Sequence, residues 1–197
     1  EATGSMIVDI GGGTTEVAVI SLGGIVISKS LRVVGDKLNE DIVQFARSEH
    51  NLLLGEKTAE DIKISIGCVY PVEEPLEATM KGRDLVSGLP KQVRVDGEQI
   101  RKAMSRSVNS LIEAIRSTIE ETPPELVADI MERGIILVGG GGLLRGLDTL
   151  VAEQTEMPVK VANDPLTAVV RGTGVVLEDI DGLKEVLVGT HYQEPPK

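Results

Sequence analysis

The sequence predicts an α/β fold in which helices flank a mixed sheet and a smaller α+β subdomain is attached to it. Two patterns point to this class. Between residues 6 and 29, three short apolar runs follow one another across glycine-containing turns, as in a β-meander. Later, a long helical pattern is followed by an apolar strand at 135–138, a second glycine-rich turn and a further helical pattern. This alternation is typical of an α/β layer.

The composition permits a folded core and excludes one class of partner. The 197 residues are 41% hydrophobic, which is enough for one good core or two small ones. The 31 acidic and 20 basic residues give a net charge of -11, and no basic cluster offsets it. Aromatic residues are only 2%, so the stacking platforms that single-stranded nucleic acid needs are missing. We therefore expect no nucleic-acid partner.

Cysteine usage and hydropathy favour a cytoplasmic location. The single cysteine, Cys68, excludes an intramolecular disulfide and a multi-cysteine zinc site, which fits a reducing compartment. No apolar run approaches the roughly 20 residues that span a bilayer, and no export signal opens the chain. The chain begins at Glu1 without an initiator Met and enters an apolar strand within a few residues, so we expect a fragment of a longer protein.

Local patterns place helices and strands along the chain. Three strands are expected at 6–9, 16–20 and 25–29, and a helix N-capped by Thr58 is expected at 58–66. The other expected elements are helices at 37–47, 97–121, 143–154 and 165–178, an irregular α+β lobe at 69–97, and strands at 135–138 and 158–161. The polar tail at 186–197 is expected to be disordered.

The first turn with chemical potential follows the first strand. Asp9 precedes Gly11, Gly12 and Gly13, and Thr14 opens the next strand. Glycines let the backbone approach an anion closely, with N–H groups aimed at phosphate oxygens. Asp9 could hold Mg²⁺ through water, because Mg²⁺ prefers oxygen ligands and keeps much of its hydration. The alternative is a tight hairpin, but one or two glycines would suffice for that, so the pattern favours phosphate binding.

The second such turn, Gly139 to Gly142, lies between the strand at 135–138 and the next helix. This position offers free N–H groups and the positive end of a helix dipole at the carboxyl edge of a sheet. No Gly-Lys-Ser/Thr sequence follows, and the GxGxxG pattern is absent, so it is neither a P-loop nor a dinucleotide fingerprint. Two such turns could close on a nucleotide from two sides.

A third candidate is the helical segment Glu60-Asp61-Ile62-Lys63, where Glu60 and Lys63 share one helix face. By spacing alone, the simpler interpretation is a solvated ion pair worth about 0.3–0.5 kcal/mol. His50 and His191 have no metal-ligand pattern beside them, and both are expected at the surface.

The motifs resemble those of a known superfamily. Residues 9–20 resemble the second phosphate motif of the ATPases that include actin, sugar kinases and heat-shock chaperones, and residues 137–148 resemble their adenosine motif. Residues 123–134 and 164–172 are most similar to the MreB family of bacterial actin-like proteins. The resemblance implies the C-terminal half of an actin-like ATPase fold. Residues 1–35 and 101–185 would form subdomain IIA, with its ribonuclease H-like core, and 36–100 would form subdomain IIB.

The resemblance also implies roles for individual residues. Thr14 would place the attacking water, and Asp9 would act on Mg²⁺. The cofactor-binding residues would be Gly12, Gly13 and Thr14 at the phosphates, Glu60, Asp61, Ile62 and Lys63 against the adenosine, and Gly140, Gly141, Gly142 and Leu143 on its other side. Val138 departs from the pattern, since relatives often carry Thr there.

The implied function is that of a filament-forming cytoskeletal protein that binds ATP with Mg²⁺, directs cell-wall synthesis and maintains rod shape. It would self-associate and meet membrane-bound cell-shape and wall-synthesis proteins at the inner face of the cell membrane. The family's first phosphate motif, catalytic Glu and membrane contact are not in this chain, so by itself it is expected to be inactive. Two alternatives remain open, a sugar-kinase-type phosphotransferase and a non-enzymatic assembly module.

Overall fold

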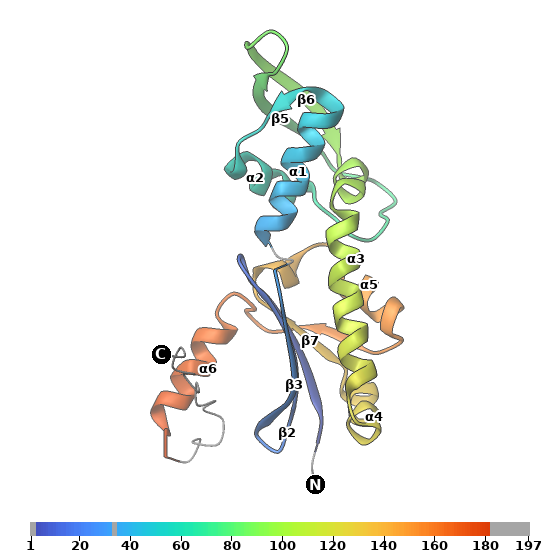
Figure 1. Ribbon diagram of the computed structural model, residues 1–197, viewed down its shortest axis with the longest axis vertical. Coiled ribbons are helices and arrows are strands. Elements are labelled where there is room, and N and C mark those ends of the chain that lie inside the picture. Colours follow the sequence, from blue (N-terminus) through green and yellow to red (C-terminus); the bar gives the residue numbers. More distant parts are fainter. Residues whose placement is uncertain (1–2, 33–34, 182–197) are drawn as a thin grey trace, which may run out of the picture.

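A computed structural model describes residues 3–32 and 35–181 of the chain (Figure 1). A mixed five-stranded sheet forms its lower part, with the strand order β3-β2-β1-β7-β8. Its strands are β1 Ser5–Ile10, β2 Thr15–Ser21, β3 Gly24–Leu31, β7 Ile135–Val138 and β8 Val159–Val161. The β-meander expected from the sequence is therefore one side of this sheet.

The central strand β1 explains why the two glycine-rich turns meet. Alternate side chains of β1, Met6, Val8 and Ile10, are at most 2% exposed, as expected for a strand with neighbours on both edges. β1 pairs antiparallel with β2 and parallel with β7, where Asp9 lies opposite Val138. Because the carboxyl ends of parallel strands lie at the same edge of a sheet, the turns after β1 and β7 emerge side by side.

A second, smaller sheet lies at the other end of the molecule (Figure 1). Its three antiparallel strands are β4 Leu52–Leu53, β5 Glu77–Asp84 and β6 Pro90–Asp96. The helices α1 Gly35–His50 and α2 Glu56–Ile66 pack with this sheet. The irregular lobe expected at 69–97 is therefore mostly a regular β5–β6 hairpin.

One long helix, α3 Gly97–Glu121, connects the two sheets and runs beside both (Figure 1). It begins with a capping box, in which the Asp96 carboxylate accepts from the Gln99 N–H and the Gln99 side chain accepts from the Asp96 N–H. Its apolar stripe is buried as the 3.6-residue period predicts. The remaining helices are α4 Pro124–Arg133, α5 Leu147–Thr155 and α6 Ala168–Glu178.

The expected fold class, a mixed sheet flanked by helices with a smaller α+β part, is confirmed. Several helix starts were wrong. α2 begins at Glu56 after Gly55, so Thr58 is not its N-cap. The helix expected at 143 begins at Leu147, because a 3₁₀ turn at Gly140–Leu143 and a left-handed Gly146 precede it. The helix expected at 165 begins at Ala168.

Of the two histidines expected at the surface, the structure describes His50. His50 is half-buried rather than a surface residue, because its ring packs edge-on against Phe45 with 5.3 Å between ring centroids. His191 and the tail at 186–197 lie outside the described residues. Within the part of the chain that the structure describes, no helix has the length and apolar character required to cross a membrane.

Candidate functional site

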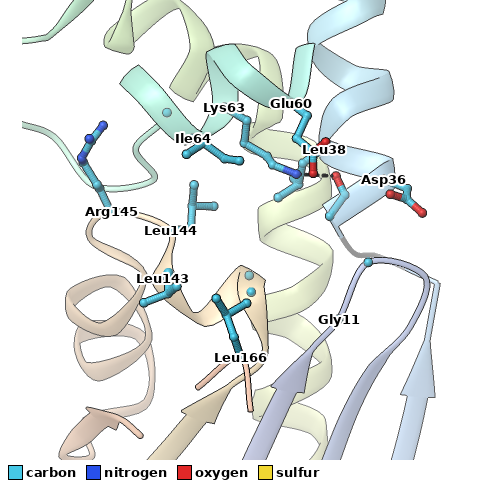
Figure 2. A pocket seen from close by; sticks show the side chains of 15 residues that line it. Gly11, Asp36, Leu38, Glu60, Lys63, Ile64, Leu143, Leu144, Arg145 and Leu166 are labelled. Carbon is cyan, nitrogen blue, oxygen red and sulfur yellow. Dashed lines mark hydrogen bonds between the residues drawn. The ribbon is translucent and has the colours of Figure 1, made fainter. Parts of the chain in front are cut away.

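A cavity of about 550 Å³ opens between α2 and the turns at the edge of the larger sheet (Figure 2). Four segments line it: the turn after β1 with the start of α1, one face of α2, the turn after β7, and the loop after β8. The lining residues are Gly11, Gly12, Gly35, Asp36, Leu38, Glu60, Lys63, Ile64, Gly67, Gly140, Gly141, Leu143, Leu144, Arg145 and Leu166. The site is thus assembled from parts of the chain far apart in sequence.

The first wall is the glycine turn after β1. The Gly11 N–H donates to the Thr14 carbonyl at 3.0 Å, which closes the turn. The first two N–H groups of α1 also bond to this turn. The Gly35 N–H donates to the Gly11 carbonyl at 3.2 Å, and the Asp36 N–H donates to the Gly12 carbonyl at 3.1 Å. A Cβ on Gly13 would meet nothing within 4 Å. The turn is therefore anchored at its base and open at its tip.

The second wall is the turn after β7, which packs tightly on the end of β1. A Cβ on Gly141 would lie 2.2 Å from Ile10 Cγ2. Gly139 has φ +78°, and a Cβ there would lie 2.4 Å from the Ile10 carbonyl oxygen and 2.6 Å from Asp9 Oδ1. The Gly142 N–H donates back to the Gly139 carbonyl at 3.2 Å. The sequence predicted the N-terminus of an α-helix directly after these glycines. The glycines instead form a 3₁₀ turn, and the α-helix starts only at Leu147.

The third wall is α2, whose Lys63 points into the cavity. Its Nζ donates to the Gly35 carbonyl at 2.9 Å (dashed in Figure 2). Burial lowers the pKa of Lys63, and the nearby Glu60 and Asp36 carboxylates oppose that shift. Lys63 is thereby part of the cavity wall rather than of a solvated surface pair, and Glu60 lies one helical turn away in the same lining.

Asp9 lies at the carboxyl end of β1, beneath the two turns. Its side chain is half-buried, and burial first, then the Glu16 carboxylate, raises the pKa of Asp9. A negative charge disfavoured by its surroundings is one that a cation would stabilise. Among the described residues, no three His, Cys, Asp or Glu side chains gather as a metal cage. A single carboxylate that reaches Mg²⁺ through water is compatible with this donor set.

The structure brings half of the twelve predicted site residues to the cavity surface. Those that line it are Gly12, Glu60, Lys63, Gly140, Gly141 and Leu143. The other six do not: Asp9, Gly13, Thr14, Asp61, Ile62 and Gly142. Gly13 and Thr14 are exposed on the outer part of the first turn, and Asp61 is exposed on the outer side of α2. Ile62 is only 4% exposed and packs in the hydrophobic core, and Gly142 is buried against Leu137.

Several lining residues were not predicted. Ile64, Leu144 and Arg145 lie within two residues of predicted ones, so a wider window around each motif would have included them. Gly35, Asp36 and Leu38 belong to the start of α1. The sequence there indicated only the break between a strand and a helix, and no binding motif. Leu166 reaches the cavity from the loop after β8, and no local pattern marks it.

Two sheets joined by one long helix, with a cavity between α2 and the carboxyl ends of β1 and β7, define an actin-like α/β protein. Solved structures of this kind match it closely. MreB5 of Spiroplasma citri bound to ADP gives a TM-score of 0.87 at 40% identity over 90% of this chain and 54% of that chain. The same protein bound to AMPPNP gives 0.88 at 40% identity over 93% and 55%. The MamK double helical filament gives 0.75 at 26% identity over 88% and 54%.

The sequence model described as MreB/Mbl protein matches residues 1–185, so the chain belongs to the MreB/Mbl family. It is 48% identical over 183 residues to the cell shape-determining protein Mbl of Bacillus subtilis (strain 168), covering 93% of this chain and 55% of that protein. It is 50% identical over 181 residues to the cell shape-determining protein MreB of Escherichia coli (strain K12), covering 92% and 52%. The chain thus spans about half the length of these relatives.

Proposed function

We propose that this chain supplies one side of the ATP site of a filament-forming cytoskeletal protein that maintains rod shape. The observation that carries the proposal is the shared cavity, in which both glycine-rich turns and the Glu60–Lys63 face of α2 meet. Its volume of about 550 Å³ lies in the range of small-molecule and cofactor sites, roughly 300–1,000 Å³. The relatives whose structures hold ADP and AMPPNP share this fold.

The phosphates would lie at the turn after β1. Gly12 and Gly13 leave room for an anion there, because neither would bring a Cβ against the open side of the turn. Asp9 would hold Mg²⁺ through water, and the cation would neutralise phosphate charge. Thr14, exposed at the end of the turn, would orient the attacking water. We expect Lys63 to secure this end, since it binds Gly35, which in turn binds Gly11.

The base would lie at the other end of the cavity. Exposed apolar side chains of Ile64, Leu143 and Leu166 line that end, and they would cover the faces of a purine. Glu60, which accepts but cannot donate when ionised, suits ribose hydroxyls. Gly140 and Gly141 would let the backbone approach the nucleotide from the β7 side.

The relatives support a proposal for the assembly of the whole protein. Cell shape-determining proteins are among the most similar sequences, and one similar fold is solved as a double helical filament. We propose that the whole protein forms filaments, meets membrane-bound cell-shape and wall-synthesis proteins, and acts at the inner face of the cell membrane. Within it, 1–35 and 101–185 would form subdomain IIA, and 36–100 would form subdomain IIB.

Nucleotide binding can be tested directly by NMR titration of the chain with ATP and Mg²⁺. We expect weak binding, because the chain supplies only one side of the ATP site. The dissociation constant should be in the millimolar range, which corresponds to a binding free energy of about -4 kcal/mol. The amide signals of Gly12, Gly140 and Gly141 should shift. Glu60→Gln should weaken binding, whereas Asp61→Asn, on the outer side of the same helix, should not. Equal effects of the two substitutions, or no shifts at all, would favour the non-enzymatic assembly module.

Hydrolysis is a separate expectation. Catalysis in this class depends on holding the phosphates from both sides and positioning water. The 197-residue chain carries the second phosphate motif alone, so its phosphate release with Mg²⁺ should equal background. Turnover close to that of an intact actin-like ATPase would contradict the roles assigned above.

A further inference from the structure

A second set of contacts joins α2 to the β7 side of the cavity, and the nucleotide roles above do not use it. The Arg145 Nη1 donates to the Ser65 carbonyl at 2.6 Å, and the Arg145 carbonyl accepts from the Val69 N–H at 2.9 Å. Arg145 also forms an isolated parallel bridge with Cys68. The loop after the 3₁₀ turn is thus bound to the segment that leaves α2.

Lys63 and Ser65 both belong to the last turn of α2, but their partners lie at opposite sides of the cavity. The Lys63 side chain bonds to Gly35 at the phosphate end, whereas the Ser65 carbonyl bonds to Arg145 at the base end. Figure 2 shows Arg145 at one side of the cavity and Lys63 with Asp36 toward the other, with Ile64 and Leu144 between them. The width of the cavity is therefore held at two separate places.

The chemistry of the Arg145 contact suits its position. The Ser65 carbonyl lies in the last turn of α2, where carbonyls lack intrahelical partners and carry partial negative charge. A guanidinium donor there forms a charge-assisted hydrogen bond, which is stronger than a neutral one. The bond is not required to hold α2 in the fold, because the buried side chains Ala59, Ile62 and Ile66 anchor the helix in the core.

We propose that Arg145 is a positioning residue for the base end of the nucleotide site. It holds the last turn of α2 against the turn after β7, and so sets the gap between Ile64 and Leu143 that would take the base. This rests on the proposed function. Removal of the side chain leaves the backbone bond from Val69 and the Lys63 contact in place, so the base end loosens while the phosphate end keeps its geometry.

The test compares ligands with and without a base. NMR titrations of the chain with ATP and with tripolyphosphate, both with Mg²⁺, are recorded for the parent chain, Arg145→Ala and Arg145→Lys. Arg145→Ala should lower ATP affinity about tenfold, in the range of one lost charge-assisted hydrogen bond, and leave tripolyphosphate within about twofold. Arg145→Lys keeps a donor and should restore most of the ATP affinity. Arg94→Ala, which removes an exposed arginine paired with Glu77, is the matched control and should resemble the parent.

Each outcome decides the proposal. Unchanged ATP affinity in Arg145→Ala, or equal loss for ATP and tripolyphosphate, overturns it. If the parent chain binds no ATP, the proposed function fails. Amide hydrogen exchange of the ligand-free chain then tests separately whether the Arg145 side chain holds the last turn of α2. Arg145→Ala should speed exchange in the last turn of α2, which loses the side-chain bond to the Ser65 carbonyl, and leave Val69, Gly35 and Asp36 unchanged. Unchanged exchange in the last turn of α2 would show that the Arg145 side chain does not hold this helix end.

Discussion

The two glycine-rich turns look alike in the sequence, but they use glycine for different reasons. Both follow neighbouring parallel strands and both line the cavity. In the turn after β1, a Cβ on Gly13 would meet nothing within 4 Å, whereas a Cβ on Gly141 after β7 would lie 2.2 Å from Ile10 Cγ2. The first turn keeps space free for a ligand. In the second turn, Gly139 and Gly141 fit against the strand beside it, so these two glycines are required for packing before any ligand arrives.

This difference separates effects on folding from effects on binding. A side chain added at Gly139 or Gly141, in the turn after β7, must displace Ile10, which is 2% exposed on the central strand. A side chain added at Gly13, in the turn after β1, projects into open space. Four substitutions test whether the two turns differ in this way, and their expected effects decrease in turn.

Gly141→Val should have the largest effect, because the new side chain would overlap Ile10 at the end of β1. Overpacking of a core site costs about 1–3 kcal/mol and occasionally more, and close approach to both the side chain and the carbonyl of Ile10 places this one at the upper end. Urea denaturation of the chain measures the loss. Gly13→Val is the control, and it should leave the denaturation midpoint unchanged. Equal midpoints for the two variants would remove the distinction between the turns.

Thr14→Ala should slow hydrolysis on the order of 10²-fold while leaving nucleotide binding largely intact, because the hydroxyl would place water rather than hold phosphate. Single-turnover phosphate release measures this rate. The assay requires a longer protein that contains this chain and has the full length of its relatives. Thr14→Ser, which keeps the hydroxyl, is the control. An unchanged rate in Thr14→Ala would show that another group positions the water.

Gly13→Val should weaken ATP binding about tenfold without a change in stability, since the side chain would occupy the space that a phosphate needs. Calorimetric or NMR titration against the parent chain gives the affinity, and the urea midpoint reports the fold. Retained affinity would indicate that the phosphates do not approach this turn.

Asp9→Asn should have the smallest effect, a slight rise of the thermal midpoint at neutral pH. Burial raises the pKa of Asp9 in the folded state above its unfolded value of about 3.9. The ionised carboxylate therefore costs stability at neutral pH, and this cost fades as the pH falls through the folded pKa. The difference between variant and parent should shrink between pH 7 and pH 4.

Magnesium provides the control for this pair. If Asp9 holds the cation, Mg²⁺ should raise the midpoint of the parent and not that of Asp9→Asn. A difference between the two proteins that is constant with pH would contradict the assigned titration, and equal responses to Mg²⁺ would contradict the assigned ligand.

Elements built from local patterns were predicted well. The period-2 runs of β1 to β3, the apolar run of β7 and the 3.6-residue stripe of α3 each follow from a short stretch of sequence. Helix starts were predicted less well, since Gly55 and Gly146 begin α2 and α5 through backbone conformation rather than through a side-chain cap. The regular β5–β6 hairpin was also missed, because three prolines and several glycines at 69–97 suggested irregular structure.

Within the candidate site, the two glycine turns, Glu60 and Lys63 could be chosen from motif spelling, and family membership follows from the same stretches. The other residues that line the cavity could not be chosen in this way. Ile62 faces the core while Lys63 faces the cavity, because the rotation of α2 is decided by what it packs against. The tight fit of Gly141 on Ile10 and the bond from Arg145 to Ser65 join residues that are far apart in the chain. Local sequence carries backbone preference and hydrophobic period, whereas such contacts exist only after distant segments have been brought together by the core.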